Sequence, residues 1–314
     1  MFRPIAILTH GDLDGMVCGI LLLQGISQDA SLRITNGEKL AKELEVLAGQ
    51  TEPPQNVYVT DVPLVSHAGP SVMKLVADLG QRGCKTHVYD HHCGWEAAQP
   101  PDMFATLVVD VRKTTAAAIL WRELLHGNES CQQWLRLLSE KDRSSEEGIR
   151  RDFGLLASLM QPMHWRHTEA VLRALASGGK LSPELEDLSR WYFDIHVPKE
   201  REIALQAEVL RTAHGRKLAW MDLRAYHEHF NVSRPAVEIH GADLVATVIK
   251  GAILLGGKSI DQGIDLTFLH GQHILETETI VIAGHKTPVR ISPKAGRATD
   301  SFVAAVRQFI LDRL

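Results

Sequence analysis

Three short segments of the sequence carry side chains that can bind metal ions and move protons. The segment HGDLDG (residues 10–15) contributes an imidazole and two carboxylates, Asp61 contributes a carboxylate, and DHH (residues 90–92) contributes a carboxylate with two imidazoles. Each of these groups follows a short apolar run, which is the pattern of a buried strand. Whether they form one site depends on how those strands are arranged.

The first half of the chain alternates between strand-like and helix-like patterns. We expect strands at residues 4–9, 31–35, 56–60, 85–89 and 105–109, with helices at 15–25, 38–48 and 67–82. Strands separated by helices indicate a parallel sheet with right-handed crossovers. The carboxyl ends of parallel strands share one edge of the sheet, which is where such sheets bind ligands. The three polar segments are therefore predicted to meet at that edge.

A cluster of carboxylates and imidazoles would repel itself or carry strongly shifted pKa values unless cations bind it. Oxygen-rich ligation with imidazoles and no thiolate favours Mn²⁺, with Mg²⁺ or Co²⁺ as alternatives and Zn²⁺ less suited. One carboxylate can bridge two ions about 3.5–4 Å apart, the separation used in two-metal phosphoryl chemistry. Each segment alone also fits a helix cap, a turn or a solvated pair. The coincidence of all three at strand ends favours the metal site.

The rest of the chain predicts a second, smaller domain. The pattern is mostly helical from residue 113 to about 212, with a break expected at His196-Val197-Pro198. Strands are expected at 217–223, 263–269 and 279–283, before an amphipathic helix at 299–313. We predict an α/β protein with an N-terminal parallel sheet covered by helices on both faces. The expected domains are residues 1–185 (parallel sheet with helices), 186–213 (helical connector) and 214–314 (smaller α/β).

The composition of the chain excludes some classes of protein and of binding partner. The chain has 314 residues, 45% hydrophobic and 23% charged, which is typical of soluble globular proteins. It has no apolar run of about 20 residues for a membrane span, and its first residues lack the pattern of a signal peptide. Four cysteines without a CxxC pair argue against a disulfide framework or a zinc–thiolate cluster, and fit a reducing cytoplasm. The net charge of −4 disfavours long nucleic acid and leaves a small anionic substrate or a short single strand.

HGDLDG, the aspartate of VTDVP and the DHH of VYDHH, in this order, resemble the motifs of the DHH phosphoesterase superfamily. The resemblance covers about residues 5–145. The superfamily includes RecJ-type exonucleases, phosphodiesterases of short oligonucleotides and cyclic dinucleotides, exopolyphosphatases and manganese pyrophosphatases. It implies a phosphoesterase that uses two metal ions, with Mn²⁺ as the preferred ion. It also implies that residues 1–185 form the catalytic domain and residues 214–314 a substrate-binding domain.

The resemblance also implies the metal ligands. There are six of them: His10 and Asp12 on one ion, Asp14, His91 and Asp142 on the other, and Asp61 between the two. Asp110, which follows the fifth expected strand, is an alternative to Asp142 as the last ligand.

The remaining residues of the DHH segment are implied to act beside the metals. Asp90 would hold His91 or a metal-bound water, as such sites require. His92 points to the opposite side of the chain from His91 and would meet the phosphate or the leaving oxygen. His92 and Asp61 are therefore the predicted catalytic residues.

Two segments are candidates for substrate binding. Arg112, Lys113 and Thr114 follow the fifth strand at an expected helix start, where backbone N–H groups can hold an anion. The segment 285–297 is basic and contains no acid, and it predicts a phosphate clamp formed by His285, Lys286, Arg290, Lys294 and Arg297. Solvated loops are the alternative for both segments.

The sequence predicts the substrate less directly than it predicts the type of reaction. The superfamily's second domain commonly carries a GGGHxxAAG-like segment, which this sequence does not show cleanly, and the Ser-Arg-Lys-Lys segment of the pyrophosphatases is absent. We expect a nucleotide phosphodiester, either a short oligonucleotide or a cyclic dinucleotide. Hydrolysis of polyphosphate or pyrophosphate and a catalytically inactive binding module are the alternatives. The sequence does not determine the oligomeric state, and a dimer is open.

Overall fold

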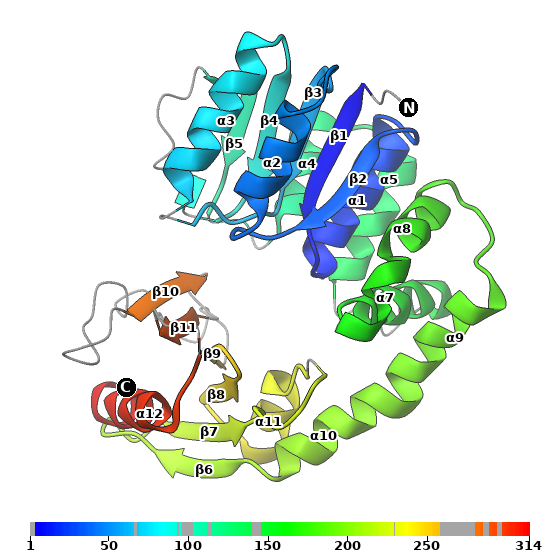
Figure 1. The fold of residues 1–314 in the computed structure, drawn as a ribbon. Coiled ribbons are helices and arrows are strands. Elements are labelled where there is room, and N and C mark those ends of the chain that lie inside the picture. The colour runs from blue at the N-terminus through cyan, green and yellow to red at the C-terminus, as the bar shows by residue number, and fades with distance from the viewer. Residues whose placement is uncertain are drawn as a thin grey trace. The chain divides into compact units, whose positions relative to one another are not determined.

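A computed structural model describes residues 4–65, 68–92, 94–95, 103–111, 113, 115–139, 146–228, 230–257, 280–284, 289–293 and 297–314. Figure 1 shows the fold. The chain divides into two compact units, Met1–Tyr192 and Phe193–Leu314. Each unit has its own sheet and hydrophobic core, and no helix among the described residues is long and apolar enough to cross a membrane.

The first unit is built on a five-stranded, all-parallel sheet with the order β2-β1-β3-β4-β5. Its strands are β1 (Ile5–His10), β2 (Ser31–Thr35), β3 (Asn56–Thr60), β4 (Lys85–Asp90) and β5 (Thr106–Val109). These elements confirm the five strands expected from the sequence. Because β2 and β3 flank β1 on opposite sides, the strand order reverses at β1, and a crevice for ligands forms at such a point.

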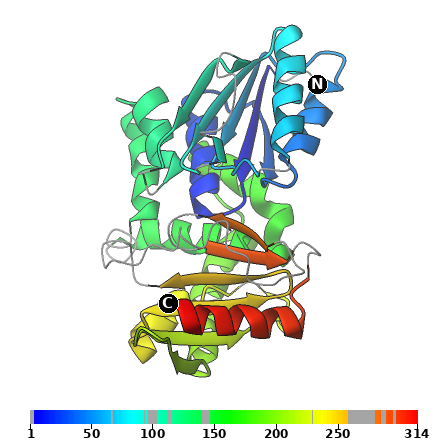
Figure 2. The same cartoon turned by 90° about the vertical axis from the view of Figure 1, so that its left-hand side faces the viewer.

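Helices cover both faces of this sheet (Figures 1 and 2). On one face, α2 (Leu40–Ala48) and α3 (Gly69–Gln81) pack against the sheet through a core that includes Leu44, Val76 and Leu79. The other face is covered by α1 (Leu13–Gly25) and α4 (Ala116–Leu124). Outside them the layer continues with α5 (Glu129–Leu135), η3 (Arg136–Leu138), α7 (Glu147–Leu159), η4 (Pro162–His167) and α8 (Thr168–Ala176).

Helix α1 is apolar on all sides because it lies between the sheet and the outer helices. Every residue from Met16 to Leu23 is buried, and the helix contacts β1, α4, α5 and α8. Gly15, in its first turn, lets the helix begin directly behind the end of β1: a Cβ there would lie 2.5 Å from the carbonyl oxygen of His10. The sequence thus places the two carboxylates of HGDLDG at the junction of a buried strand and a buried helix.

The connector stays helical where a break was expected. Helix α9 (Pro183–Trp191) leads through a π-helical turn, η5 (Tyr192–His196), into α10 (Val197–Leu205). Pro198 lacks an N–H and its ring crowds the preceding turn. The wider π turn, a common way of bending a helix without ending it, accommodates the proline.

The second unit has a six-stranded sheet with the order β10-β11-β9-β8-β7-β6. Its strands are β6 (Glu208–Arg211), β7 (Lys217–Asp222), β8 (Leu244–Ile249), β9 (Ala252–Gly257), β10 (Ile280–Gly284) and β11 (Val289–Pro293). β7 and β8 are parallel and the other pairs are antiparallel. Helix α12 (Asp300–Arg313) packs on one face and α11 (Ser233–His240) on the other, as Figure 2 shows for α12.

Strand β6 corrects the expectation that the connector is helical to residue 213. The chain leaves the helix after Leu205, and β6 forms a hairpin with β7 through a turn in which Gly215 has a φ of 78°. Three of the four β6 residues are exposed, so no apolar periodicity identified this strand. The strand expected at 279–283 is found as β10, whereas that expected at 263–269 lies outside the described residues.

Candidate metal centre

The predicted residues meet where β1, β3 and β4 end. Two groups of side chains have candidate ligand atoms within 4.8 Å of one another: His10, Asp12 and Asp61 form one, and Asp61, Asp90, His91 and His92 form the other. Asp61 belongs to both groups. The convergence of the three motif segments at one sheet edge is therefore observed, and a shared carboxylate lies at its centre.

Asp61 is held in an unusual backbone conformation. Among the described non-glycine residues only Asp61 has a positive φ, 57°. That conformation costs about 1–2 kcal/mol for a residue with a Cβ. The side chain is 1% exposed; its Oδ1 lies 3.1 Å from His91 Nε2, while the buried Oδ2 has no hydrogen-bond partner in the described structure. A strained, buried carboxylate with one oxygen outside any hydrogen bond in the described structure fits the role of a metal ligand.

Asp14 is held by the start of another helix. Its Oδ2 accepts a hydrogen bond from the N–H of Ala116 at 2.6 Å, and its Oδ1 accepts one from Ala117 at 3.0 Å. These are the first two residues of α4, where the helix dipole favours a negative charge. Burial raises the pKa of Asp14 to about 7, against the opposing effect of the two amides. The carboxylate lies 3.7 Å from His91 Nε2.

His10 and Asp12 pair with each other at the end of β1. His10 Nδ1 lies 2.9 Å from Asp12 Oδ2, and Asp12 Oδ1 accepts the N–H of Gly15 as the N-cap of α1. Burial works to raise the pKa of Asp12, but the contact with His10 lowers it below its usual range. The same pair raises the pKa of His10, although burial acts against this. Asp12 thus combines the capping role and the site position that the sequence left as alternatives.

The two histidines of DHH have different partners. Asp90 Oδ1 accepts the backbone N–H groups of His91 and His92 and lies 2.6 Å from Nδ1 of the His92 ring. The expected contact of Asp90 with the His91 side chain is not the one observed; Asp90 orients His92 instead. The His91 ring lies with Nδ1 3.3 Å from the carbonyl oxygen of Lys113. Since a carbonyl only accepts, Nδ1 carries the proton and Nε2 faces Asp61.

The carboxylates of the site repel one another, and a bound cation would offset this repulsion. Burial raises the pKa of Asp61 well above its usual value, and the charges of Asp12, Asp14 and Asp90 raise it further. Burial and the neighbouring His92 lower the pKa of His91, which favours the neutral ring. Neutral imidazole and carboxylate oxygen are suitable ligands for a borderline divalent ion, whose charge would reverse the pKa shifts of the acids. The buried Oδ2 atoms of Asp61 and Asp90, both without a hydrogen-bond partner in the described structure, fit this requirement.

Several predicted residues cannot be placed in the centre. Six of them lie outside the described residues: Arg112, Thr114, Asp142, His285, Lys286 and Lys294. Asp110 lies 3.8 Å from Arg122 and belongs to neither group of ligand atoms. Lys113 contributes its carbonyl to His91, and its side chain is exposed.

Two of the predicted clamp residues, Arg290 and Arg297, are described, and both lie in the second unit. Arg290 is exposed on β11 and donates from Nε to Ser292 Oγ at 3.1 Å. Arg297 is exposed just before α12. Their role as a phosphate clamp stays a prediction.

The sequence analysis did not identify the groups that hold the candidate ligands in place by hydrogen bonds. The amides of Ala116 and Ala117 hold Asp14 although they are 102 and 103 residues away in sequence. Thr9 donates to the carbonyl of Gly15, and Thr60 donates to the hydroxyl of Thr9 at 3.0 Å, so a buried hydroxyl pair joins β1, β3 and α1. A threonine at the end of each of two neighbouring strands was the available signal in the sequence.

Comparison with known proteins identifies the fold of the chain. No family model matches the sequence, and no curated protein matches it. A solved DHH domain, described as belonging to a family of ribosomal proteins, aligns with a TM-score of 0.64 and 14% identity, over 98% of this chain and 87% of the other. An uncharacterised protein from Helicobacter pylori G27 aligns over 98% of both chains at 12% identity, and its TM-score of 0.38 is too low to establish a shared fold.

The first comparison extends over both units and agrees with the geometry of the site. The five-stranded parallel sheet carries HGDLDG, Asp61 and DHH at the ends of β1, β3 and β4, in the order that the resemblance predicted. This chain therefore has the fold of the DHH-domain proteins.

Proposed function

We propose that the chain is a Mn²⁺-dependent hydrolase of phosphodiester bonds in a small nucleotide substrate. The observation that carries the proposal is Asp61, a buried carboxylate in a strained conformation that is common to two groups of ligand atoms. A bridging carboxylate with oxygen and imidazole ligands on either side is the arrangement that two-metal phosphoryl chemistry needs.

The residues divide naturally between two ions. His10 and Asp12 would hold one ion, Asp14 and His91 the other, and Asp61 both. Asp142 is proposed as a further ligand of the second ion. Mn²⁺ held there, or Mg²⁺ or Co²⁺ in its place, would lower the pKa of a water and polarise the phosphoryl oxygens.

His92 is proposed as the residue that meets the substrate. Its Nδ1 lies 2.6 Å from the buried carboxylate of Asp90, and we propose that Nε2 is the ring nitrogen that meets a phosphate or leaving oxygen. A carboxylate behind an imidazole fixes the orientation of the ring. His92 can then stabilise negative charge on the leaving oxygen or supply its proton.

The substrate class follows from charge and from the missing segments. A net charge of −4 disfavours long nucleic acid and favours a short single-stranded oligonucleotide or a cyclic dinucleotide. Polyphosphate or pyrophosphate would use the same chemistry and is the first alternative. A catalytically inactive binding module is the second alternative. The presence of all the candidate metal ligands that lie among the described residues argues against it. We further propose a cytoplasmic location, since the cysteines at 18, 84 and 131 are free and buried.

Hydrolysis of bis-p-nitrophenyl phosphate, with Mn²⁺ or with EDTA, tests the proposal. We expect Mn²⁺-dependent turnover in the wild type and none in Asp61→Asn. Asparagine is the appropriate replacement because it tolerates a positive φ and keeps the side-chain volume. Asp29→Asn, an exposed change in the same unit, is the matched control and should stay active. Absence of turnover in the folded wild type at every metal concentration would rule out the enzyme.

A panel of substrates then separates the alternatives. We expect short oligonucleotides or cyclic dinucleotides to be cleaved faster than polyphosphate, pyrophosphate and long duplex DNA. Faster hydrolysis of pyrophosphate or polyphosphate would favour the first alternative. Processive degradation of long DNA would contradict the charge argument.

A further inference from the structure

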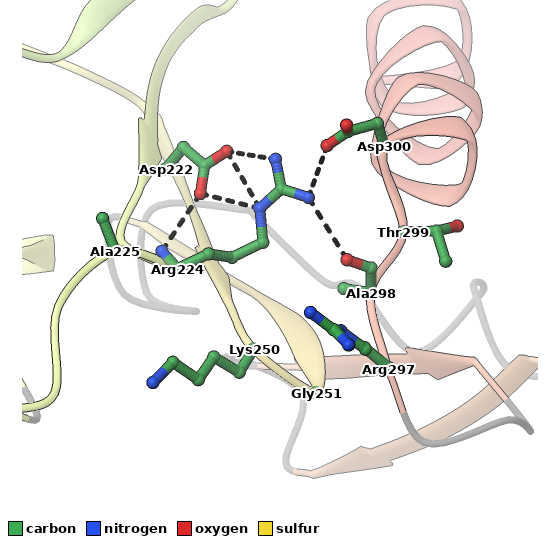
Figure 3. A pocket seen from close by; sticks show the side chains of 9 residues that line it. All are labelled: Asp222, Arg224, Ala225, Lys250, Gly251, Arg297, Ala298, Thr299 and Asp300. Carbon is green, nitrogen blue, oxygen red and sulfur yellow. Dashed lines mark hydrogen bonds and ion pairs between the residues drawn. The ribbon is translucent and has the colours of Figure 1, made fainter.

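The second unit contains a pocket that the metal chemistry does not use. It has a volume of about 1080 Å³ and lies where the parallel strands β7 and β8 end and α12 begins. Three separate segments line it, and Figure 3 shows all of the lining residues: Asp222, Arg224, Ala225, Lys250, Gly251, Arg297, Ala298, Thr299 and Asp300. The volume is that of a pocket for a nucleotide-sized molecule.

One arginine of the pocket is fixed by its neighbours. The Arg224 guanidinium makes two hydrogen bonds from Nε and one from Nη2 to the Asp222 carboxylate, and its Nη1 lies 2.6 Å from Asp300 Oδ1. Nη1 also donates to the carbonyl of Ala298 at 3.2 Å. Figure 3 shows this guanidinium between the two acids. The two acids of the pocket are thus both engaged by one cation, which reduces their repulsion of an anion.

The two other cations have no acidic partner among the described residues. Lys250 is exposed and donates to Nδ1 of His227 at 3.2 Å, and Arg297 is exposed with no ion pair in the described structure. Figure 3 places the Arg297 guanidinium between the start of α12 and the turn at Lys250 and Gly251. The N–H of Ala298 donates to the carbonyl of Lys250 at 3.0 Å, so the backbone joins the two segments that carry these cations.

The charged side chains of the pocket that form no ion pair in the described structure are therefore both positive. Its lining contains three basic and two acidic side chains, and both acids are taken up by Arg224. Thr299 is the N-cap of α12, so the pocket also faces the positive end of a 14-residue helix dipole. A guanidinium and an ammonium at a helix start are the groups that bind phosphate, the guanidinium through paired N–H donors.

We propose that this pocket binds a phosphate ester of nucleotide size, with Arg297 and Lys250 contacting the phosphate. Arg224 joins the end of β7 to the start of α12 through its contacts with Asp222 and Asp300. Of these residues only Arg297 was singled out in the sequence; Arg224 and Lys250 enter through the structure. The proposal needs neither the metal ions nor the hydrolysis described above. It assigns a binding site to the second unit by itself.

Calorimetric titration of the full chain in EDTA at low salt, with inorganic phosphate and with adenosine monophosphate, tests the proposal. We expect saturable binding of both ligands, tighter for the nucleotide. Arg297→Gln and Lys250→Gln should each weaken binding by at least roughly tenfold, since each removes a charge-assisted hydrogen bond. In amide NMR spectra, the ligand should shift Gly251, Ala298 and Thr299.

The control is Arg313→Gln, which removes the same charge from an exposed position at the far end of α12. It should bind like the wild type; an equal loss in this variant would show general surface charge and overturn the proposal. Wild-type binding by both Arg297→Gln and Lys250→Gln, or adenosine binding as tightly as its monophosphate, would overturn it too. A nucleotide that binds no more tightly than phosphate would refute the assigned ligand size.

Asp61→Asn separates this proposal from the hydrolase. The variant lacks the central metal ligand and should still bind adenosine monophosphate with wild-type affinity in EDTA. Loss of that binding would locate the nucleotide at the metal centre and refute the pocket. Retained nucleotide binding by a wild-type protein that shows no turnover at any Mn²⁺ concentration would refute the hydrolase alone.

Discussion

At Asp61 two unfavourable features coincide on one residue. The backbone is in the left-handed region, and the buried carboxylate is surrounded by three others, from Asp12, Asp14 and Asp90. Both costs persist only because the ends of β3 and β4 fix the chain, as the hydrogen bond from the Asp61 N–H to the Tyr89 carbonyl shows. A cation is the partner that would offset the repulsion.

Metal affinity is predicted to rise with pH up to about 7. The raised pKa of Asp14, about 7, means that this carboxylate is protonated below that pH and must lose its proton to bind an ion. Apparent affinity should therefore increase between pH 5.5 and 7 and then level off, with proton release on binding. Calorimetry in buffers of different ionisation enthalpy measures both effects. An affinity independent of pH over this interval would contradict the assignment of Asp14 as a ligand.

Substitution of the two histidines should affect metal binding and turnover differently. His91→Ala removes an imidazole whose Nε2 faces Asp61, and we expect loss of Mn²⁺ binding together with activity. His92→Ala leaves that contact in place, so the ion should stay bound while hydrolysis fails. Metal content and turnover, measured on both variants, distinguish the roles. If His92→Ala loses metal as completely as His91→Ala, the division is wrong.

At the scale of elements, the start of α4 acts as part of the site. Ala116 is its first residue, and the N-cap Thr115 has extended backbone angles of φ −145° and ψ 139°. Proline is accepted at a first helical position and prefers an extended residue before it. The position therefore allows one donor to be removed without ending the helix.

Ala116→Pro should weaken metal binding while the helix is kept. The change removes the N–H that Asp14 accepts at 2.6 Å, and the ring carbon takes the place of that hydrogen and displaces the carboxylate. We expect metal affinity to fall roughly ten- to hundredfold, the usual effect of losing a group that orients a ligand. Glu129→Pro, at the first residue of α5, is the matched control and should bind metal normally. Equal affinities of both variants would show that the amide does not hold Asp14.

Gly15→Ala should separate α1 from the end of β1. The new Cβ would lie 2.5 Å from the His10 carbonyl oxygen, which is backbone and cannot move aside cheaply. Overpacking of this kind typically costs about 1–3 kcal/mol, and here it would also displace Asp12 and Asp14. Urea denaturation and metal titration check both effects. Gly148→Ala in α7, where a Cβ meets nothing within 4 Å, is the control and should not be destabilised.

At the scale of the molecule, the two units have separate cores and separate predicted ligands. All described candidates for metal binding lie in Met1–Tyr192, and the phosphate pocket lies in Phe193–Leu314. The connecting helix passes from one unit to the other through the π turn at Tyr192–His196.

Mn²⁺ should stabilise the first unit in particular. At about 100 times the dissociation constant, a ligand stabilises the state it binds by about 2.7 kcal/mol. We expect hydrogen exchange to slow at the ends of β1, β3 and β4, and adenosine monophosphate to slow it instead around the end of β8 and the start of α12. Mass spectrometry of exchanged peptides measures both patterns. Protection by Mn²⁺ confined to the second unit would contradict the metal centre.

The sequence by itself determined the strands of the first sheet and the convergence of the motifs. Apolar runs of strand length, separated by helical patterns, leave a parallel sheet as the solution, and parallel strands end on one edge. His10, Asp12, Asp61 and His91 were therefore predicted as neighbours from local pattern alone. The end of the connector was not predicted, because the exposed β6 is defined by its pairing with β7.

Only the tertiary structure shows which donor or acceptor contacts each carboxylate, imidazole and guanidinium. Asp90 orients His92 instead of the His91 side chain, two amides of α4 hold Asp14, and Arg224 connects Asp222 to the start of α12. The contacts of Asp14 with α4 and of Arg224 with Asp300 join residues that are distant along the chain, and the contact of Asp90 with His92 depends on how the two imidazole rings are turned. A hydrogen bond depends on angstrom-scale placement of donor and acceptor, whereas a hydrophobic pattern specifies only the face or the edge on which a residue lies.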